Sequence, residues 1–124
     1  MAVGLAGKRV LIVEDEYFIA TDLARALQKE DAIVVGPAGN ISVAMTLAAD
    51  APIDAAVLDI NLHGATSYPI ADQLAERAVP CLFLTGYDDR QVPQGYRDLP
   101  RVAKPFPMQR VLNAVAQLLT KEQQ

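Results

Sequence analysis

The most constraining feature of this sequence is a short apolar run at residues 55–58 that ends directly on a carboxylate, Asp59. The run holds only alanine, valine and leucine, and it lacks the alternation that marks a half-exposed strand. Such runs are typical of strands in a parallel sheet that helices cover on both faces. An aspartate at the carboxyl end of such a strand lies where open α/β sheets bind ligands. Because aspartate is also common in turns, this stretch alone leaves a structural role for Asp59 open.

The same pattern recurs along the chain. Further apolar runs predict strands at residues 9–13, 32–35 and 81–84, and a brief one at 101–103. We expect Gly36-Pro37 to end the second of these strands, because glycine and proline commonly mark the ends of regular elements.

The segments between the strands carry apolar residues three and four positions apart, which is the spacing of one helical face. They predict four helices, whose inner faces include Ile19 and Leu23, Ala44 and Leu47, Ile70 and Leu74, and Val111 and Leu118. Asn40 or Ser42 can cap the second helix, and Pro69 fits the first turn of the third. The segment 88–99 contains a proline and a glycine, so any helix there should be short or irregular.

Five strands that alternate with helices predict an α/β fold, a doubly wound five-stranded parallel sheet with right-handed crossovers. In this architecture the carboxyl ends of all strands meet at one edge of the sheet. The residues that follow or end the strands at this edge are Glu14, Asp15, Asp59, Thr85 and Lys104. The sequence therefore predicts that three carboxylates, one hydroxyl and one ammonium group lie close together.

Composition indicates one globular domain, because 52% of the 124 residues are hydrophobic and 21% are charged. We expect a single domain over residues 1–124, with an ordered core at about 8–120 and no output domain. The net charge of −4, without a basic cluster, argues against nucleic-acid binding. No apolar stretch reaches the ~20 residues of a membrane span. Without signal-peptide features, and with Cys81 as the lone cysteine, the chain is expected to be cytoplasmic.

The predicted group of side chains suits phosphoryl chemistry that depends on a metal ion. Carboxylates held close repel one another and favour a cation, and oxygen ligands suit Mg²⁺. We expect the ligands to be Glu14, Asp15, Asp59 and the backbone carbonyl of Asn61. Beside Mg²⁺, the Asp59 carboxylate can attack a phosphoryl group and carry it as an aspartyl phosphate. Lys104 can pair with one phosphoryl oxygen, and Thr85 can donate a hydrogen bond to another.

The arrangement resembles the receiver domains of two-component response regulators, over about residues 9–119. The matching residues are Glu14-Asp15, Asp59, Thr85 and Lys104-Pro105-Phe106. The resemblance implies a flavodoxin-like sheet of order 2-1-3-4-5 and a cis peptide between Lys104 and Pro105. It also implies that Asp59 accepts a phosphoryl group from a sensor histidine kinase or phosphotransfer protein. A downstream protein partner then responds, and the chain promotes its own phosphorylation and dephosphorylation without being an enzyme.

A narrower likeness, and a departure from the family, concern the switch. Residues 83–88 look like a subgroup of stand-alone receivers whose fourth-strand motif reads Phe-Ala-Thr-Gly followed by an aromatic residue. Where many receivers carry a switching tyrosine or phenylalanine, this chain has Arg101. Tyr87 is the first aromatic residue after Thr85, so Tyr87 and Arg101 are the switch candidates. His63, in the loop after Asp59, is expected to be an exposed loop residue.

Two other functions fit the sequence less well. A phosphohydrolase of the haloacid dehalogenase type needs a second acid two positions after its nucleophile, where this chain has Asn61. Its nucleophile also tends to lie on the first strand of the sheet. A receiver-like binding module with a vestigial site would be free to lose members of the acidic group, yet all are present. Whether the chain gives an output or acts as a phosphate sink for a shared kinase stays open.

Overall fold

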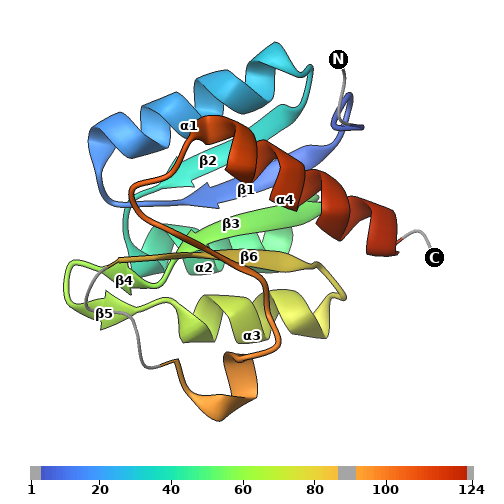
Figure 1. Cartoon of the computed structure of the whole chain (residues 1–124). Helices are drawn as coiled ribbons and strands as arrows, with labels where there is room; N and C mark the ends of the chain where they lie inside the picture. The colour runs from blue at the N-terminus through green and yellow to red at the C-terminus, as the bar shows by residue number, and fades with distance from the viewer. Residues whose placement is uncertain (1–3, 87–91, 123–124) are drawn as a thin grey trace.

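Five parallel strands form one sheet at the centre of the structure (Figure 1). The computed structural model describes residues 4–86 and 92–122. The strands of this sheet are β1 (Arg9–Val13), β2 (Ile33–Ala38), β3 (Ala55–Asp59), β6 (Cys81–Thr85) and β7 (Arg101–Ala103). Their order is β2-β1-β3-β6-β7, which is 2-1-3-4-5 when these five strands are numbered along the chain. The predicted doubly wound, flavodoxin-like fold is therefore confirmed.

Strand β3 lies in the middle of the sheet and places Asp59 at its carboxyl edge. It pairs with β1 on one side, where Val13 is opposite Leu58. On the other side it pairs with β6, where Leu84 is opposite Asp59. All five residues of β3 are buried, as expected for a strand with neighbours on both sides and helices on both faces. Asp59 is thus held at the end of a fully buried strand.

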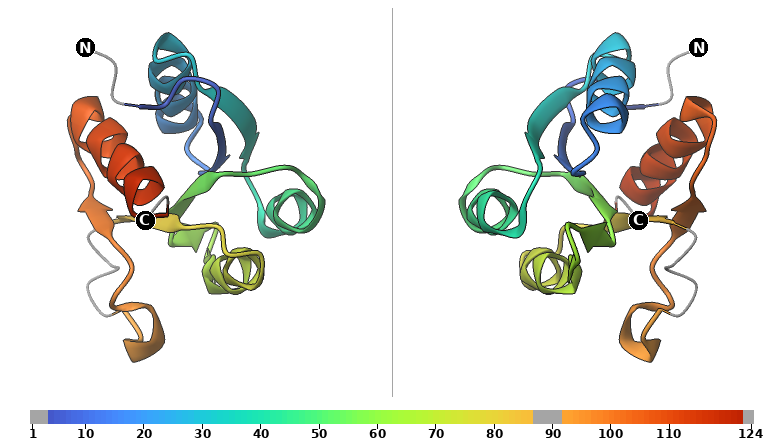
Figure 2. Two further views of the ribbon diagram at one scale, coloured as in Figure 1. Left: turned by 90° about the vertical axis from the view of Figure 1, so that its right-hand side faces the viewer. Right: turned by 90° about the vertical axis from the view of Figure 1, so that its left-hand side faces the viewer.

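Helices cover both faces of the sheet (Figure 2). On one face lie α1 (Tyr17–Lys29) and α4 (Met108–Glu122), and on the other lie α2 (Ile41–Asp50) and α3 (Tyr68–Glu76). Successive strand residues point alternately to the two faces, so each strand contributes to two apolar clusters. Among the described residues, no helix combines the length and the apolar character needed to cross a bilayer.

The sequence signals at the starts of α2 and α3 have clear structural counterparts. Asn40 Oδ1 accepts a hydrogen bond from the Val43 N–H at 2.9 Å. Of the two predicted caps, Asn40 rather than Ser42 therefore begins α2. Pro69 lies in the first turn of α3. The N–H groups of a first turn have no partner within the helix, so the N–H that proline lacks is not needed there.

The predicted end of the second strand is wrong. Strand β2 continues through Gly36-Pro37 to Ala38, and its register against β1 shifts between Leu11 and Val13. The irregularity is possible because β2 is an edge strand, where a proline need not donate to a neighbour on both sides. Two peptide bonds are cis, the predicted one at Lys104-Pro105 and a second at Gly36-Pro37.

A small hairpin follows β3 where the sequence indicated only a loop. It pairs β4 (Asn61–Leu62) with β5 (Ala65–Thr66) in antiparallel fashion. The turn between them contains His63 and Gly64, whose φ angles are 48° and 85°. Two-residue strands are too short to leave a periodic signal in sequence, so the hairpin could not be foreseen.

The segment before β7 contains a short 3₁₀ helix, η2 (Gln94–Tyr96). This agrees with the expectation of a short or irregular helix within residues 88–99. The first part of that segment, residues 88–91, lies outside the described residues.

Gly36 is the position where the fold depends most directly on glycine. Its φ is +93°, and an added Cβ would lie 2.8 Å from the Ala38 backbone nitrogen and 3.1 Å from the Ile12 carbonyl oxygen. We expect Gly36→Ala to lower the free energy of unfolding by about 3 kcal/mol, since both the dihedral angle and the backbone contacts oppose a side chain. Urea denaturation followed by circular dichroism measures this change.

Gly64 provides the matched control for this substitution. Its φ is +85°, yet a Cβ built there meets no atom within 4 Å. Gly64→Ala should therefore cost only the dihedral strain, about 1 kcal/mol. Equal losses in the two variants would show that the close backbone approach at Gly36 contributes nothing.

Candidate functional site

The carboxyl edge of the sheet brings together side chains from four strands. Glu14 and Asp15 directly follow β1, Asp59 ends β3, Thr85 ends β6, and Lys104 directly follows β7. These strands are neighbours in the sheet, in the order β1-β3-β6-β7. Residues far apart in sequence are thereby placed around one site, with Asp59 on the central strand.

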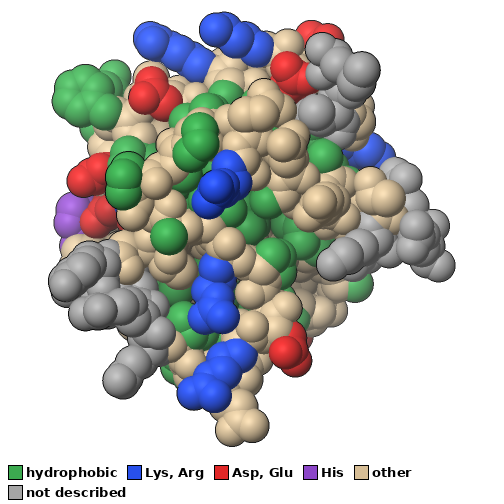
Figure 3. All heavy atoms as spheres, viewed as in Figure 1, with side chains coloured by type: hydrophobic (Ala, Val, Ile, Leu, Met, Phe, Trp, Pro, Cys, Tyr) green, Lys and Arg blue, Asp and Glu red, His purple; other side chains and the backbone are tan. Residues whose placement is uncertain are grey.

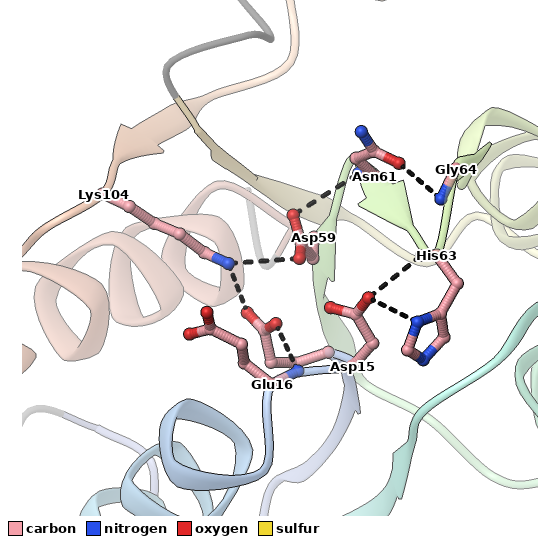
Figure 4. A network of polar contacts seen from close by, with 8 residues as sticks. Asp15, Glu16, Asp59, Asn61, His63, Gly64 and Lys104 are labelled. Carbon is pink, nitrogen blue, oxygen red and sulfur yellow. Dashed lines mark hydrogen bonds and ion pairs between the residues drawn. The ribbon is translucent and has the colours of Figure 1, made fainter.

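Lys104 bridges two carboxylates at the centre of this site (Figure 4). Its Nζ lies 2.9 Å from Glu14 Oε1 and 3.1 Å from Asp59 Oδ2. Only 2% of Glu14 and 4% of Asp59 is exposed, so the two carboxylates are almost fully removed from water. The Glu16 backbone N–H donates a further hydrogen bond to Glu14 Oε2 at 3.0 Å. One ammonium group therefore forms ion pairs with two buried carboxylates.

Burial dominates the electrostatics of the two acids. It raises the pKa of Glu14 to about 7, and the nearby charge of Asp59 adds to this, while the Glu16 N–H and Lys104 oppose it. Burial likewise raises the pKa of Asp59 against the opposing charge of Lys104. Burial alone would lower the pKa of Lys104, but its hydrogen bonds and charge contacts with the two acids outweigh this and raise it. Among the described residues at this edge, three carboxylates face one ammonium group, so the acidic groups outnumber the cation.

Asp15 lies beside these acids but is held by the β4–β5 hairpin. Its Oδ2 accepts a hydrogen bond from the His63 N–H at 3.0 Å and lies 3.5 Å from His63 Nδ1 (Figure 4). The His63 side chain is exposed, as predicted, yet its contact with Asp15 was not foreseen from the sequence. The two residues are 48 positions apart, and only the fold shows that they meet.

The hydrogen bonds of Asn61 and Thr85 at this edge all involve a backbone group of one of the two partners. The Asn61 N–H donates to Asp59 Oδ1 at 3.4 Å, and Asn61 Oδ1 accepts from the Gly64 N–H at 3.1 Å. The Thr85 carbonyl oxygen accepts a hydrogen bond from the Lys104 N–H at 2.8 Å, which fixes the start of the segment after β7. Within the described part of the chain, no hydrogen bond is made by the Thr85 hydroxyl.

Three carboxylates at this edge fit a divalent metal ion. Glu14, Asp15 and Asp59 each offer one oxygen, and these oxygens all lie within 4.8 Å of one another. An all-oxygen, anionic donor set is the one that hard cations such as Mg²⁺ prefer. The excess of carboxylates over ammonium groups at this edge points to the same kind of ligand.

The two switch candidates are placed differently. Tyr87 lies outside the described residues. Arg101 begins β7 and is exposed, so it does not occupy the interior position that a rotating aromatic side chain would fill.

An aromatic cluster that the sequence did not predict lies on the α3 side of β6 and is made by Tyr68, Phe83 and Tyr96. The rings of Tyr68 and Tyr96 stack with centroids 4.4 Å apart, and the Tyr68 ring lies edge-on to buried Phe83 at 5.7 Å. The Tyr96 hydroxyl donates to Asp72 Oδ1 at 2.9 Å, which raises the pKa of the tyrosine. The cluster fixes η2 against α3 and β6.

Comparison with known proteins gives a consistent result. Residues 10–116 match the response regulator receiver domain family. The chain is 41% identical to SdrG from Sphingomonas melonis Fr1, and the solution structure of SdrG matches it with a TM-score of 0.81 over 96% of this chain and 99% of that one. The BeF3-activated conformation of SdrG from Pseudomonas melonis Fr1 matches with a TM-score of 0.76 and 43% identity, over 92% of this chain and 98% of that one.

A longer protein is similar over most of this chain. The transcriptional regulatory protein PdtaR from Mycobacterium tuberculosis is 32% identical over 112 residues, which are 87% of this chain and 55% of PdtaR. The chain therefore spans about half the length of that relative. The family match covers every residue described at the carboxyl edge, from Glu14 to Lys104. The chain belongs to the response regulator receiver domain family.

Proposed function

We propose that this receiver accepts a phosphoryl group on Asp59 from a phosphohistidine of a sensor histidine kinase or phosphotransfer protein. The observation that carries the proposal is the placement of Asp59, which ends the central strand beside Lys104 and two further acids. The phosphorylated form then binds or releases a downstream protein partner.

The residues around Asp59 suit in-line transfer of a phosphoryl group. One Asp59 oxygen attacks the phosphorus atom while the bond from phosphorus to the histidine nitrogen breaks, so the product is an aspartyl phosphate. Lys104 Nζ, now 3.1 Å from Asp59 Oδ2, is positioned to pair with a phosphoryl oxygen. The Thr85 hydroxyl is proposed to donate to another oxygen of the same group.

We propose Glu14, Asp15 and Asp59 as the residues that hold Mg²⁺, with the Asn61 carbonyl as a further ligand. When bound, the ion supplies neutralisation of the negative charge that gathers on the phosphoryl oxygens. Glu14 and Asp59 lie closest to Lys104, and Asp15 lies on the side of the hairpin. Glu14 and Asp59 would thus contact both the ion and Lys104, whereas Asp15 would contact the ion without touching Lys104.

The alternatives are weaker than this proposal. Asp59 lies on the third strand in sequence, and Asn61 takes the place of the second acid that a phosphohydrolase of the haloacid dehalogenase type needs. A vestigial binding module does not account for three carboxylates and a lysine gathered at one edge. The relative SdrG has a BeF3-activated conformation, which supports activation of this chain by a phosphoryl group. An output role and a phosphate-sink role differ in partners, and both are consistent with transfer to Asp59.

The first functional prediction concerns the phosphoacceptor. With acetyl phosphate and Mg²⁺, the wild-type chain should gain the mass of one phosphoryl group, and Asp59→Asn should gain none. Asp54→Asn is the matched control, because Asp54 precedes the same strand at its opposite end and pairs with Arg9 at 3.3 Å. Intact-protein mass spectrometry measures the gain. A phosphorylated Asp59→Asn chain would show that another residue is the acceptor.

The second prediction concerns the metal ion. Asp15→Asn removes one of three anionic ligands without touching the Lys104 ion pairs, so Mg²⁺ affinity should fall about tenfold. Isothermal titration calorimetry gives the dissociation constants directly, and Asp54→Asn again serves as control. Phosphorylation in the presence of a chelator should stop in every variant. An Asp15→Asn chain that binds Mg²⁺ as tightly as wild type would remove Asp15 from the ligand set.

The third prediction concerns the switch. Because Arg101 is exposed, we expect phosphorylation to rearrange the loop that carries Tyr87 rather than the side chain at position 101. Amide chemical shifts with and without BeF₃⁻ should change most within residues 87–99. Tyr87→Ala should reduce these changes, whereas Tyr17→Ala, which removes an exposed ring from α1, should not. Changes centred on Arg101, with residues 87–99 unaffected, would contradict the prediction.

A further inference from the structure

His63 is the only histidine of the chain and lies in the turn of the β4–β5 hairpin. Its side chain is 72% exposed. Figure 3 shows it in purple at the rim of the molecule, next to acidic side chains in red. The proposed transfer of a phosphoryl group to Asp59 does not use this side chain, so its contact with Asp15 needs a separate explanation.

The hairpin holds His63 in a defined place. Strands β4 and β5 pair in register, with Asn61 opposite Thr66. Leu62 is buried in the core on the α2 and α3 side of the sheet. At the turn, Asn61 Oδ1 accepts a hydrogen bond from the Gly64 N–H at 3.1 Å. The position of His63 relative to the end of β3 is therefore fixed by pairing, by burial and by a closed turn.

The backbone and the side chain of His63 reach the same oxygen of Asp15. The φ angle of His63 is +48°, in the left-handed region, where histidine, asparagine and aspartate are the most enriched residues after glycine. In this conformation the His63 N–H donates to Asp15 Oδ2 at 3.0 Å. The imidazole Nδ1 lies 3.5 Å from the same Oδ2. Two groups of one residue thus converge on one oxygen of one carboxylate.

The two oxygens of Asp15 consequently have different surroundings. Oδ2 faces His63, whereas the other oxygen lies on the side of Asp59 and Lys104 (Figure 4). Asp15 contributes one oxygen to the group of carboxylate oxygens that lie within 4.8 Å of one another. An oxygen that already accepts from an N–H is a poorer ligand than the other oxygen of the same carboxylate. Asp15 is therefore arranged to bind a metal ion through one oxygen.

Direct binding of the ion by the imidazole is disfavoured by distance. Among the described residues, the side chains whose ligand atoms all lie within 4.8 Å of one another are Glu14, Asp15 and Asp59, and His63 is not one of them. The histidine contacts a ligand of the ion and not the ion itself. Residues in this position orient metal ligands and adjust how strongly they bind.

We propose that His63 is a positioning residue that makes Asp15 a ligand through one oxygen and thereby selects the smaller divalent ion. The inference rests on the proposed Mg²⁺ site. Mg²⁺ demands near-ideal octahedral geometry, which single carboxylate oxygens suit, whereas Ca²⁺ takes more ligands in looser geometry and often binds both oxygens of a carboxylate. Because His63 occupies Oδ2, Asp15 suits Mg²⁺ better than Ca²⁺.

The test titrates Mg²⁺ and Ca²⁺ separately into the unphosphorylated full chain. Isothermal titration calorimetry is run at one alkaline pH, where free imidazole is neutral. His63→Gly removes the side chain and leaves a residue that adopts positive φ freely. Its Mg²⁺ affinity should fall about fivefold, less than the roughly 10- to 100-fold typical of a lost outer-shell partner, because the backbone N–H remains. Ca²⁺ affinity should stay the same or rise, so the ratio of the two affinities should fall.

His63→Asn is the conservative variant. Asparagine also tolerates positive φ, and its side-chain nitrogen is separated from Cα by the same number of bonds as the imidazole Nδ1. It should restore the Mg²⁺ affinity and the ratio to within about twofold of wild type. Thr66→Ala shortens an exposed side chain on the same hairpin and is the matched control, which should leave both values unchanged. Circular dichroism checks that each variant is folded.

A second measurement needs no metal ion. A neutral imidazole that donates from Nδ1 to a carboxylate must carry its proton on Nδ1. Long-range proton–nitrogen NMR correlations of the metal-free wild-type chain should therefore show the Nδ1-protonated tautomer of His63. Asp15→Ala removes the acceptor, so this preference should disappear.

The outcomes separate this inference from the proposed function. Unchanged Mg²⁺ and Ca²⁺ affinities in His63→Gly would leave the metal site in place and overturn the role of His63. Equal losses for the two ions, no restoration by His63→Asn, or an Nε2-protonated tautomer in wild type would overturn it as well. A wild-type chain that binds no Mg²⁺ would overturn the proposed metal site and this inference together. The mass gain of wild type and Asp59→Asn tests the phosphoacceptor independently of His63.

Discussion

The contact of one ammonium group with two buried carboxylates holds the carboxyl edge of this domain together. Lys104 Nζ lies 2.9 Å from Glu14 and 3.1 Å from Asp59. Two acids removed from water repel each other and lose hydration, so without a nearby cation the edge would be strongly destabilised. The lysine reaches them because β7 pairs with β6, and the Thr85 carbonyl oxygen accepts its backbone N–H at 2.8 Å. The order of the strands thus determines the charge balance of the site.

This balance leaves the site favourable to a further cation. Lys104 contacts both Glu14 and Asp59, while within the described residues Asp15 contacts the hairpin through His63. Burial raises the pKa of Glu14 to about 7, which means that its negative charge is expensive in this environment. A proton, a metal ion or a donor group can each relieve that cost. In the proposed function, a phosphoryl group on Asp59 would add negative charge to the same place, which would couple its arrival to cation binding.

The sequence predicted well what depends on short-range patterns and poorly what depends on long-range contacts. Uninterrupted apolar runs identify buried central strands, and their carboxyl ends must share one edge, so the grouping of Glu14, Asp59 and Lys104 could be foreseen. The true end of β2 could not be foreseen, because an edge strand can continue through Gly36-Pro37 when its register against the neighbouring strand shifts. The β4–β5 hairpin and the aromatic cluster were missed because strands of two residues, and rings far apart in the chain, leave no periodic trace.

Strand β6 is the physical link between the acidic site and the rest of this side of the molecule. Side chains two residues apart on a strand point to the same face, so Thr85 and Phe83 both face the α3 side. Phe83 contacts the ring of Tyr68, is paired in register with Leu58 beside Asp59, and is paired with Arg101 on β7. Packed interiors do not deform continuously, so in the proposed function any displacement of Thr85 toward a phosphoryl group on Asp59 would be shared with these neighbours. A shift at the site can therefore reach the aromatic cluster and β7 through a single strand.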